Sequence, residues 1–206
     1  MINKIYTLYK RYGIIGIVEN FVLKIASVFG YKNLQILRLV CKDVTEKKRR
    51  YKYDYNIVTL NFMNFLDCCK NDKKRFSNIY IKQIQERFMQ KDSGYKCYGI
   101  MDSNVIIAYS WTSLIFVPRY DEKLKNGDAF IFDVYTHPDY RGKGLFPKLL
   151  EYQINELNKI GKKRALACID IFNRASLHAF KKNGFTEISK YYMWIKNGIV
   201  HSTLKM

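Results

Sequence analysis

The chain has 206 residues, 48% of them hydrophobic, which suits a single globular domain with a buried core and excludes a disordered protein. Its formal net charge of +18 leaves three anionic partners open: nucleic acid, a membrane surface, and a polyanionic ligand such as a nucleotide cofactor. No arginine-rich tract with interleaved aromatic residues dominates, so nucleic acid is the least expected of the three.

The five cysteines point to a reducing compartment. They are odd in number and show no C-x-x-C spacing, so neither a disulfide framework nor a zinc site is expected. We expect reduced thiols in the core of a cytoplasmic protein.

Residues 1–31 differ in character from the rest of the chain. Between positions 14 and 29 the apolar residues recur at helical spacing, after a stretch with three basic residues. Polar residues such as Glu19 and Lys24 interrupt the run, so it predicts an amphipathic helix and not a transmembrane one. Its apolar face packs on the protein itself or on a second subunit of a homo-oligomer, or it lies peripherally on an anionic membrane.

The next segments predict a strand at residues 34–41 and a basic loop at residues 47–50. We therefore expect an N-terminal extension at residues 1–50, made of the amphipathic helix, an extra strand and the basic loop. Residues 51–206 are expected to form the main domain, whose sheet begins with a strand at residues 55–60.

Two helices are predicted after that strand, at residues 62–70 and 77–90, where apolar residues recur at helical spacing. Residues 95–101 and 105–116 predict a hairpin, because the turn-forming trio Asp-Ser-Asn separates them. A charged loop at residues 118–127 leads to the next strand.

The central stretch is residues 128–146, DAFIFDVYTHPDYRGKGLF. Residues 129–136 are mostly apolar without alternation, which predicts a strand that is buried on both faces and ends before Pro138. A turn with two glycines follows, and from Leu145 the apolar residues return to helical spacing until Gly161.

That turn is a predicted anion site. The first turn of a helix leaves backbone N–H groups without partners, and the helix dipole adds partial positive charge there. Gly142 and Gly144 let the backbone approach a ligand closely, because no Cβ stands between the amides and the ligand oxygens. We expect the turn to hold a pyrophosphate.

After a further strand and helix, the last two strands are predicted at residues 190–196 and 199–204, on either side of Asn197-Gly198. The order of these elements predicts a mixed α/β (α+β) sheet with helices on both faces.

The glycine turn resembles the acetyl-coenzyme A (acetyl-CoA) binding motif of GNAT superfamily N-acetyltransferases, Q/R-x-x-G-x-G/A. Gly142 and Gly144 match this motif, and arginine is common in the family at the position of Arg141. Asp139 stands at the first position in place of Gln or Arg.

A second segment strengthens the resemblance. Residues 164–171 predict another buried strand, and a helix follows it. The residues that match the family pattern N-x-x-A/S-x-x-x-Y-x-x-x-G-F are Asn173, Ser176, Gly184 and Phe185. Phe180 stands where that pattern has tyrosine.

The resemblance implies a GNAT-like fold with a splayed central sheet. It also implies transfer of an acetyl or other short acyl group, with acetyl-CoA as the donor, by direct attack in a ternary complex. The implied contacts of its pyrophosphate are the backbone amides of Arg141, Gly142, Lys143, Gly144, Leu145 and Phe146. The implied contacts of its pantetheine arm and acyl end are Val134, Tyr135, Thr136, Asn173, Ser176 and Phe180. Lys143, Lys181 or Lys182 either faces the phosphates or is solvated.

The implied reaction is attack by an amine on the thioester carbonyl, and the ammonium, with a pKa of about 10, first has to lose a proton. Asp133 on the central strand and Asp170 at the end of its neighbour are the candidate bases. Each has an ordinary alternative role, in a salt bridge or as a cap at the end of a strand. His137 and His178 titrate in a useful range but are not favoured.

Phe180 departs from the family pattern in a way that bears on mechanism. The tyrosine usual at that position protonates the leaving thiolate, and phenylalanine cannot. A thiol with a pKa of about 8.5 leaves without an acid, and Tyr191 or Tyr192 is an alternative proton donor.

The acceptor is expected to be a small amine under the helices at residues 62–70 and 77–90, which in this family lie over the acceptor site. A protein or small polyamine acceptor stays open, although a strongly basic enzyme should repel a polycation. The basic surface favours an anionic acceptor such as a nucleotide-linked amino sugar, and the amphipathic helix suits surface-glycan assembly near a membrane. The alternative is a non-catalytic module that keeps CoA as a structural ligand or acts through its basic helix at a membrane.

Overall fold

The computed structural model of the chain describes residues 32–44, 55–71, 77–90, 94–103, 105–118, 122–196 and 199–202, together with residues 21, 24, 25 and 28. Residues 21, 24, 25 and 28 are helical. The rest of the amphipathic helix expected at residues 1–31 and the basic loop expected at residues 47–50 lie outside the described residues.

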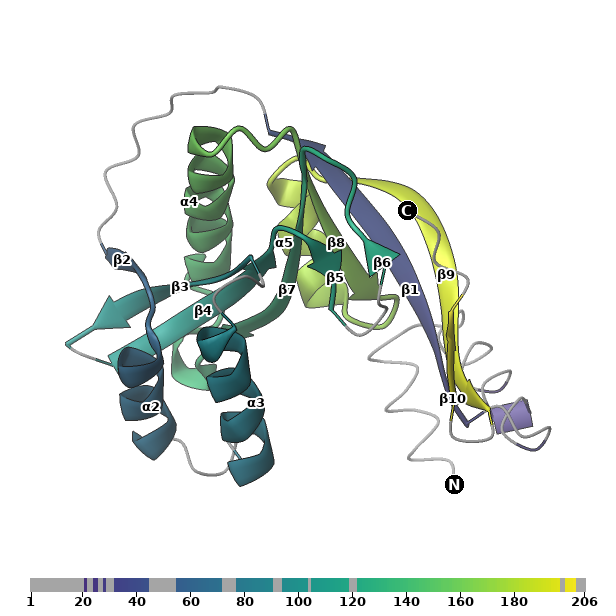
Figure 1. Ribbon diagram of the computed structural model, residues 1–206, viewed down its shortest axis with the longest axis horizontal. Coiled ribbons are helices and arrows are strands. Elements are labelled where there is room, and N and C mark those ends of the chain that lie inside the picture. The colour runs from purple at the N-terminus through teal and green to yellow at the C-terminus, as the bar shows by residue number, and fades with distance from the viewer. Residues whose placement is uncertain are drawn as a thin grey trace.

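A mixed sheet forms the centre of the molecule (Figure 1). Its strands are β1 (Lys32–Asp43), β2 (Asn56–Thr59), β3 (Tyr95–Asp102), β4 (Val105–Ser113), β7 (Asp128–Thr136), β8 (Arg164–Asp170), β9 (Thr186–Lys196) and β10 (Ile199–Ser202). They follow the order β10-β9-β1-β8-β7-β4-β3-β2. Neighbouring strands run antiparallel, except that β7 and β8 run parallel. Two short strands, β5 (Phe116–Val117) and β6 (Glu122–Lys123), form a separate ribbon.

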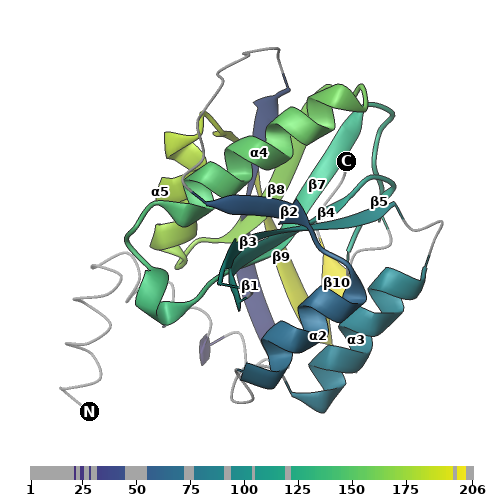
Figure 2. The same ribbon diagram turned by 90° about the vertical axis from the view of Figure 1, so that its left-hand side faces the viewer.

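Helices cover both faces of this sheet (Figure 2), and the mixed α/β fold is confirmed. α2 (Phe62–Asn71) and α3 (Asn78–Met89) lie on one face, and α4 (Leu145–Lys159) and α5 (Arg174–Lys182) lie on the other. Strand β4 shows why both faces need cover. Its Tyr109 and Trp111 pack with α2 and α3, whereas Ile107 and Ala108 pack with α4. Among the described residues, no helix has the length and apolar character needed to cross a bilayer.

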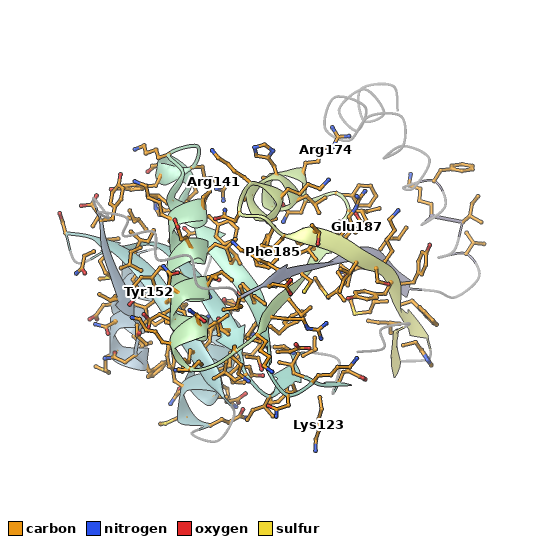
Figure 3. The ribbon with its side chains drawn as sticks, turned by 90° about the horizontal axis from the view of Figure 1, so that it is seen from above. Lys123, Arg141, Tyr152, Arg174, Phe185 and Glu187 are labelled. Carbon is orange, nitrogen blue, oxygen red and sulfur yellow. The ribbon has the colours of Figure 1, made fainter. Side chains whose placement is uncertain are left out.

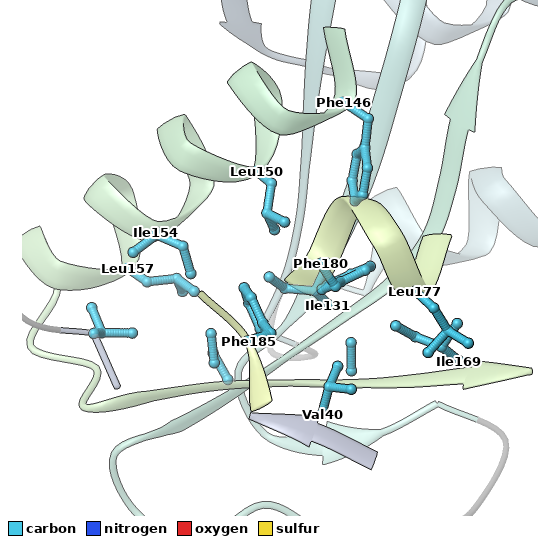
Figure 4. Close-up of a cluster of buried hydrophobic side chains, with 14 residues drawn as sticks. Val40, Ile131, Phe146, Leu150, Ile154, Leu157, Ile169, Leu177, Phe180 and Phe185 are labelled. Atoms are coloured by element: carbon cyan, nitrogen blue, oxygen red, sulfur yellow. The ribbon is translucent and has the colours of Figure 1, made fainter. Parts of the chain in front are cut away.

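A cluster of buried side chains joins α4 and α5 to the sheet (Figure 4). The face of α4 that the helical spacing predicted is buried, namely Leu145, Leu149, Leu150, Ile154 and Leu157. The rings of Phe180 in α5 and Phe185 after it lie 4.9 Å apart in this cluster. Burial of such a side chain contributes about 1.5 to 3 kcal/mol, so this face holds α4 on the sheet.

The position of β1 corrects the expected domain organisation. We expected a strand at residues 34–41 to belong to an N-terminal extension that ends at residue 50. Instead β1 lies inside the main sheet, hydrogen-bonded to β8 on one side and to β9 on the other. The reason is burial on both faces: Leu37 and Leu39 join one core cluster, and Val40 joins the cluster under α4 and α5.

The sheet divides between β7 and β8. Residues 128–131 of β7 pair with residues 164–167 of β8, and beyond Ile131 the two strands part. β7 continues beside β4, and β8 continues beside β1. At the closed end Arg164 donates to both carboxylate oxygens of Asp128, at 2.7 and 2.6 Å. The splayed sheet that the family resemblance implied is therefore present.

Replacing Asp128 with asparagine tests how much this bidentate ion pair stabilises the closed end. Asp128 is 3% exposed, and its loss leaves Arg164 without its carboxylate partner. We expect Asp128→Asn to lower the free energy of unfolding by about 2 kcal/mol in urea denaturation. Asp139→Asn, at a carboxylate 83% exposed, is the control and should change it by less than about 0.5 kcal/mol. Equal losses in the two variants would contradict this role for Asp128.

Candidate active site

Strand β7 contains a bulge just past the point where the sheet divides. Between the pairs Trp111–Phe132 and Tyr109–Tyr135, one residue of β4 faces two of β7. Asp133 lies there with a φ of +48°, a backbone conformation that residues other than glycine rarely adopt. The bulge turns the Asp133 carboxylate toward α3, where two side chains bind it.

From the bulge onward, strand residues alternate between the two helical layers. Val134 packs against the cluster under α4 and α5, whereas Tyr135 is buried beneath α2 and α3, with its ring 5.3 Å from that of Tyr109. The carbonyl oxygen of Thr136 accepts a bond from Arg141 Nε at 3.2 Å. The chain then turns through the short helix η2 (Pro138–Tyr140) toward α4.

The turn before α4 presents a row of open backbone amides. The N–H of Arg141 donates to the Pro138 carbonyl at 3.2 Å, so Arg141 does not offer its amide as we expected. For residues 142–146, the structure provides no acceptor for any backbone N–H within the described ranges. These amides lie at the positive end of the α4 dipole and suit an anion with several oxygen atoms.

Two glycines give the turn its shape. Gly142 has a φ of +79° and Gly144, the residue that caps α4, a φ of +72°. A Cβ at either position would meet nothing within 4 Å. Glycine is therefore needed for the left-handed backbone, while the space beside both residues stays open to a ligand.

Tyr140 fixes the turn to the neighbouring hairpin. Its hydroxyl donates to Asp102 Oδ2 at 2.8 Å, and the ammonium of Lys143 lies 4.7 Å from its ring centre. The bond to Asp102 raises the pKa of the Tyr140 hydroxyl. In Figure 3, Arg141 before α4 and Arg174 at the start of α5 lie on the same side of the molecule. This side carries basic residues beside the open amides.

The second matching segment is organised around the start of α5. Asn173 caps the helix by accepting the Ser176 N–H at 3.1 Å, and its side chain is exposed. Phe180 points into the core, 3% exposed, with its ring 5.3 Å from that of Phe146 (Figure 4). Asn173 thus faces solvent at the helix end, while Phe180 fills the space between two helices.

Asp170 performs the ordinary role that the sequence left open. Its Oδ1 accepts the Phe172 N–H at 2.8 Å, which closes the turn after β8. His137 similarly accepts the Asp139 N–H with Nδ1 at 3.4 Å and caps η2. His178 is exposed on α5.

Tyr191 and Tyr192 are badly placed to act as the missing acid. Both lie on β9, and the sheet order puts β9 three strands away from β7, about 14 Å at the usual strand spacing. Tyr191 is buried, 3% exposed, and it contacts the thiol of Cys168 at 3.5 Å. Burial raises the pKa of that thiol to about 11.

Asp133 lies in a polar network with two residues of α3. Arg87 Nη1 lies 2.6 Å from Asp133 Oδ2, and the Tyr80 hydroxyl donates to the same oxygen at 2.7 Å. The Tyr80 hydroxyl also lies 3.0 Å from that of Tyr109. The side chains of Arg87 and Asp133 are 17% and 20% exposed, so solvent still reaches this ion pair.

Arg87 and Tyr80 did not emerge from the sequence as site residues, although one signal pointed to them. Tyr80, Ile84 and Arg87 follow the i, i+4, i+7 spacing of one helical face, and Ile84 is fully buried. A polar residue on an inward helical face needs a polar partner. That partner is Asp133, which is 46 residues from Arg87 in the chain.

The buried hydroxyl of Tyr80 predicts a pH dependence of stability. Burial, and then the charge of Asp133, raise its pKa well above the ordinary value of 10. The unfolded chain therefore loses this proton first, and the stabilisation present below pH 10 declines as pH rises further. Between pH 8 and 11 the contribution of Tyr80 to the free energy of unfolding should fall by about 1.4 kcal/mol. In urea denaturation, the free energy of unfolding of Tyr80→Phe should decline by this much less over the same pH range than that of the natural protein. Equal declines in the two proteins would contradict a raised pKa at Tyr80.

In the comparison with protein families, the Acetyltransferase (GNAT) family matches residues 61–185. That range includes the bulge, the glycine turn and α5. Acetyltransferases of this family use acetyl-CoA as the acyl donor.

Two curated bacterial enzymes are similar to part of the chain. L-amino acid N-acyltransferase MnaT of Escherichia coli (strain K12) is 48% identical over 52 residues, which cover 25% of this chain and 30% of that enzyme. L-methionine sulfoximine/L-methionine sulfone acetyltransferase of Salmonella typhimurium (strain LT2) is 43% identical over 53 residues, 26% of this chain and 31% of that enzyme. The matches thus span about a third of the length of each relative.

A solved structure extends the likeness to most of the fold. AAC(6')-Iy, in complex with the bisubstrate analog CoA-S-monomethyl-acetylneamine, superposes with a TM-score of 0.52 at 16% identity. The superposition covers 66% of this chain and 94% of that one. At this identity the likeness concerns the fold alone. With a family match over more than half of its length, the chain belongs to the Acetyltransferase (GNAT) family.

Proposed function

We propose that this protein transfers an acetyl group from acetyl-CoA to an amine by direct attack in a ternary complex. The observation that carries the proposal is the row of amides at residues 142–146, which point from a left-handed glycine turn and have no acceptor in the described part of the chain. A diphosphate provides the several closely spaced oxygens that such a row binds. Bound there, acetyl-CoA supplies an acetyl group activated as a thioester.

The residues around the split in the sheet have distinct roles in this proposal. The amides of residues 142–146 bind the pyrophosphate, and Lys143 adds charge beside it. Residues 134–136 of β7 have left β8 and offer their edge to the pantetheine arm. Asn173, exposed at the start of α5, lies at the end of the strand that borders the split on its other side.

The transfer forms a carbon–nitrogen bond, breaks the carbon–sulfur bond and releases one proton overall. Before attack, the incoming ammonium loses its proton to the carboxylate of Asp133, which lies beside the split, directly or through a water that passes the proton to solvent. The thiolate leaves without an acid from α5, because Phe180 has no hydroxyl and lies in the core. With a pKa of about 8.5, a thiol is an adequate leaving group without protonation by the enzyme.

The acceptor in this proposal is a small amine. The two curated relatives are named as enzymes that acylate amino acids and their analogues, which supports an acceptor of this size. The net charge of +18 supports an acceptor that carries an acidic group. A nucleotide-linked amino sugar of surface-glycan assembly is one such acceptor. A non-catalytic module that keeps CoA bound is the alternative, and the absence of a hydroxyl at Phe180 favours it.

We also propose a cytoplasmic enzyme with peripheral membrane contact through residues 1–31. Phe21, Ile25 and Val28 share one helical face and are 64%, 44% and 83% exposed. Replacing all three by serine in the full chain should reduce pelleting with anionic vesicles. Unchanged pelleting would remove the membrane proposal. If the natural protein is a homo-oligomer in solution and the variant is a monomer, this face belongs to a second subunit.

The test of the enzymatic proposal is thiol release from acetyl-CoA over a panel of amino acids, amino sugars, aminoglycosides and polyamines. Turnover with at least one amine is expected. Heat of binding on adding CoA without turnover of any amine would support the non-catalytic module. Neither heat nor turnover would contradict both.

Gly144→Ala tests the amide row directly. The substitution strains the left-handed backbone and moves the amides, so we expect the calorimetric Kd for acetyl-CoA to rise about tenfold or more. Gly161→Ala is the matched control, because Gly161 has a φ of +75°, has nothing within 4 Å of a built Cβ and lies at the other end of α4. It should lose similar stability and keep its affinity. Equal affinity losses in the two variants would contradict the assignment.

A further inference from the structure

The Arg87–Asp133 ion pair leaves atoms of both partners open. Asp133 Oδ2 takes both bonds, from Tyr80 and Arg87, so Oδ1 has no partner among the described residues. Arg87 uses Nη1, and its Nε and Nη2 likewise have no acceptor in the described ranges. The side chains of Arg87 and Asp133 are 17% and 20% exposed, so solvent reaches the ion pair. The ion pair therefore presents an open carboxylate oxygen beside an open guanidinium edge.

The guanidinium of Arg87 is held in place by aromatic rings. Its central carbon lies 5.4 Å from the ring centre of Trp111 and 5.2 Å from that of Phe132. Trp111 is fully buried, so it forms a fixed wall over which the guanidinium lies in a cation–π contact. A planar guanidinium held in this way directs its donors at one place and suits a bidentate carboxylate.

The location of the ion pair connects it with the transfer reaction. Asp133 is the bulge residue of β7, beside the split to which we assign the acyl end of the donor. The ion pair lies on the face covered by α2 and α3, opposite to α4 and its amide row. An amine held at Asp133 therefore lies next to the proposed acyl group on the side that the donor's pyrophosphate does not occupy.

We propose that the acceptor is an α-amino acid, an inference that rests on the proposed function. Its ammonium binds Asp133 Oδ1, and its carboxylate binds the open Nε and Nη2 edge of Arg87. The Arg87 and Asp133 side chains touch, at 2.6 Å, so a ligand that contacts both carries its acid group and its amine close together. An α-amino acid has one carbon between them, whereas a sugar nucleotide has several bonds between phosphate and amine.

Charge balance supports the same class of acceptor. The ion pair is neutral as a unit, and an α-amino acid is neutral as a zwitterion, so binding leaves no uncompensated charge in a site that is four-fifths buried. A simple amine would leave the guanidinium edge unpaired. A simple carboxylic acid has no amine to transfer to.

The test compares each L-amino acid that is turned over with the amine that lacks its carboxylate, for example L-tyrosine with tyramine. For the natural protein kcat/KM should favour the amino acid by at least about 10-fold, the value of a single charge-assisted hydrogen bond, and by more than about 100-fold when both bonds form. Arg87→Gln should collapse this ratio toward one. Arg38→Gln removes an arginine from a different ion pair, with Glu187 at 2.8 Å, and should leave the ratio unchanged.

A binding measurement accompanies the kinetics. With CoA bound in a dead-end complex, calorimetric titration of the preferred amino acid should give heat with the natural protein and none with Arg87→Gln. If Arg87→Gln does not fold, Arg87→Lys decides, because it keeps the charge and loses the planar edge, and it should reduce the ratio as well.

The outcomes separate this inference from the proposed function. Equal turnover of amino acids and their decarboxylated amines, or a ratio that Arg87→Gln leaves intact, would overturn the inference while the transferase stands. Turnover of amino sugars alone would do the same. No turnover of any amine would remove the proposed function and this inference with it.

Discussion

The structure depends on one interruption, the loss of pairing between β7 and β8 beyond Ile131. Parallel strands inside a sheet normally satisfy each other's backbone groups along their length, so a split needs support on each side. Here β4 supports β7, and β1 supports β8, while the Asp128–Arg164 ion pair fixes the closed end. The two helical pairs then cover opposite faces of the divided sheet.

The two faces of the divided sheet have different roles in our proposal. On the α4 side, the left-handed glycines hold the amides of residues 142–146 open, and Tyr140 fixes their turn to Asp102. On the α3 side, the bulge turns Asp133 toward Arg87. The donor and the acceptor in our proposal thus approach the same opening from opposite faces. This arrangement agrees with direct transfer between two bound molecules and does not call for a covalent intermediate on the protein.

Much of this fold could be predicted from the sequence, because its strongest signals are local. The buried face of α4 follows from helical spacing, and the amide row follows from two glycines before a helix. The place of β1 could not be predicted in the same way, since an apolar strand does not specify its neighbours. The positive φ of Asp133 is imposed by pairing with β4, and its bond to Arg87 joins residues far apart in the chain. Such features belong to tertiary structure, and only the inward spacing of Tyr80 and Arg87 hinted at them.

The central claim is that the backbone amides of residues 142–146 bind the diphosphate of acetyl-CoA. Titration of ¹⁵N-labelled protein with CoA, followed by amide NMR, tests it most directly. The account predicts large downfield shifts and slower hydrogen exchange for the amides of Gly142, Lys143, Gly144, Leu145 and Phe146, with little change at Gly161 at the far end of α4. Saturating CoA that leaves those five amides unshifted and still exchanging freely would contradict it.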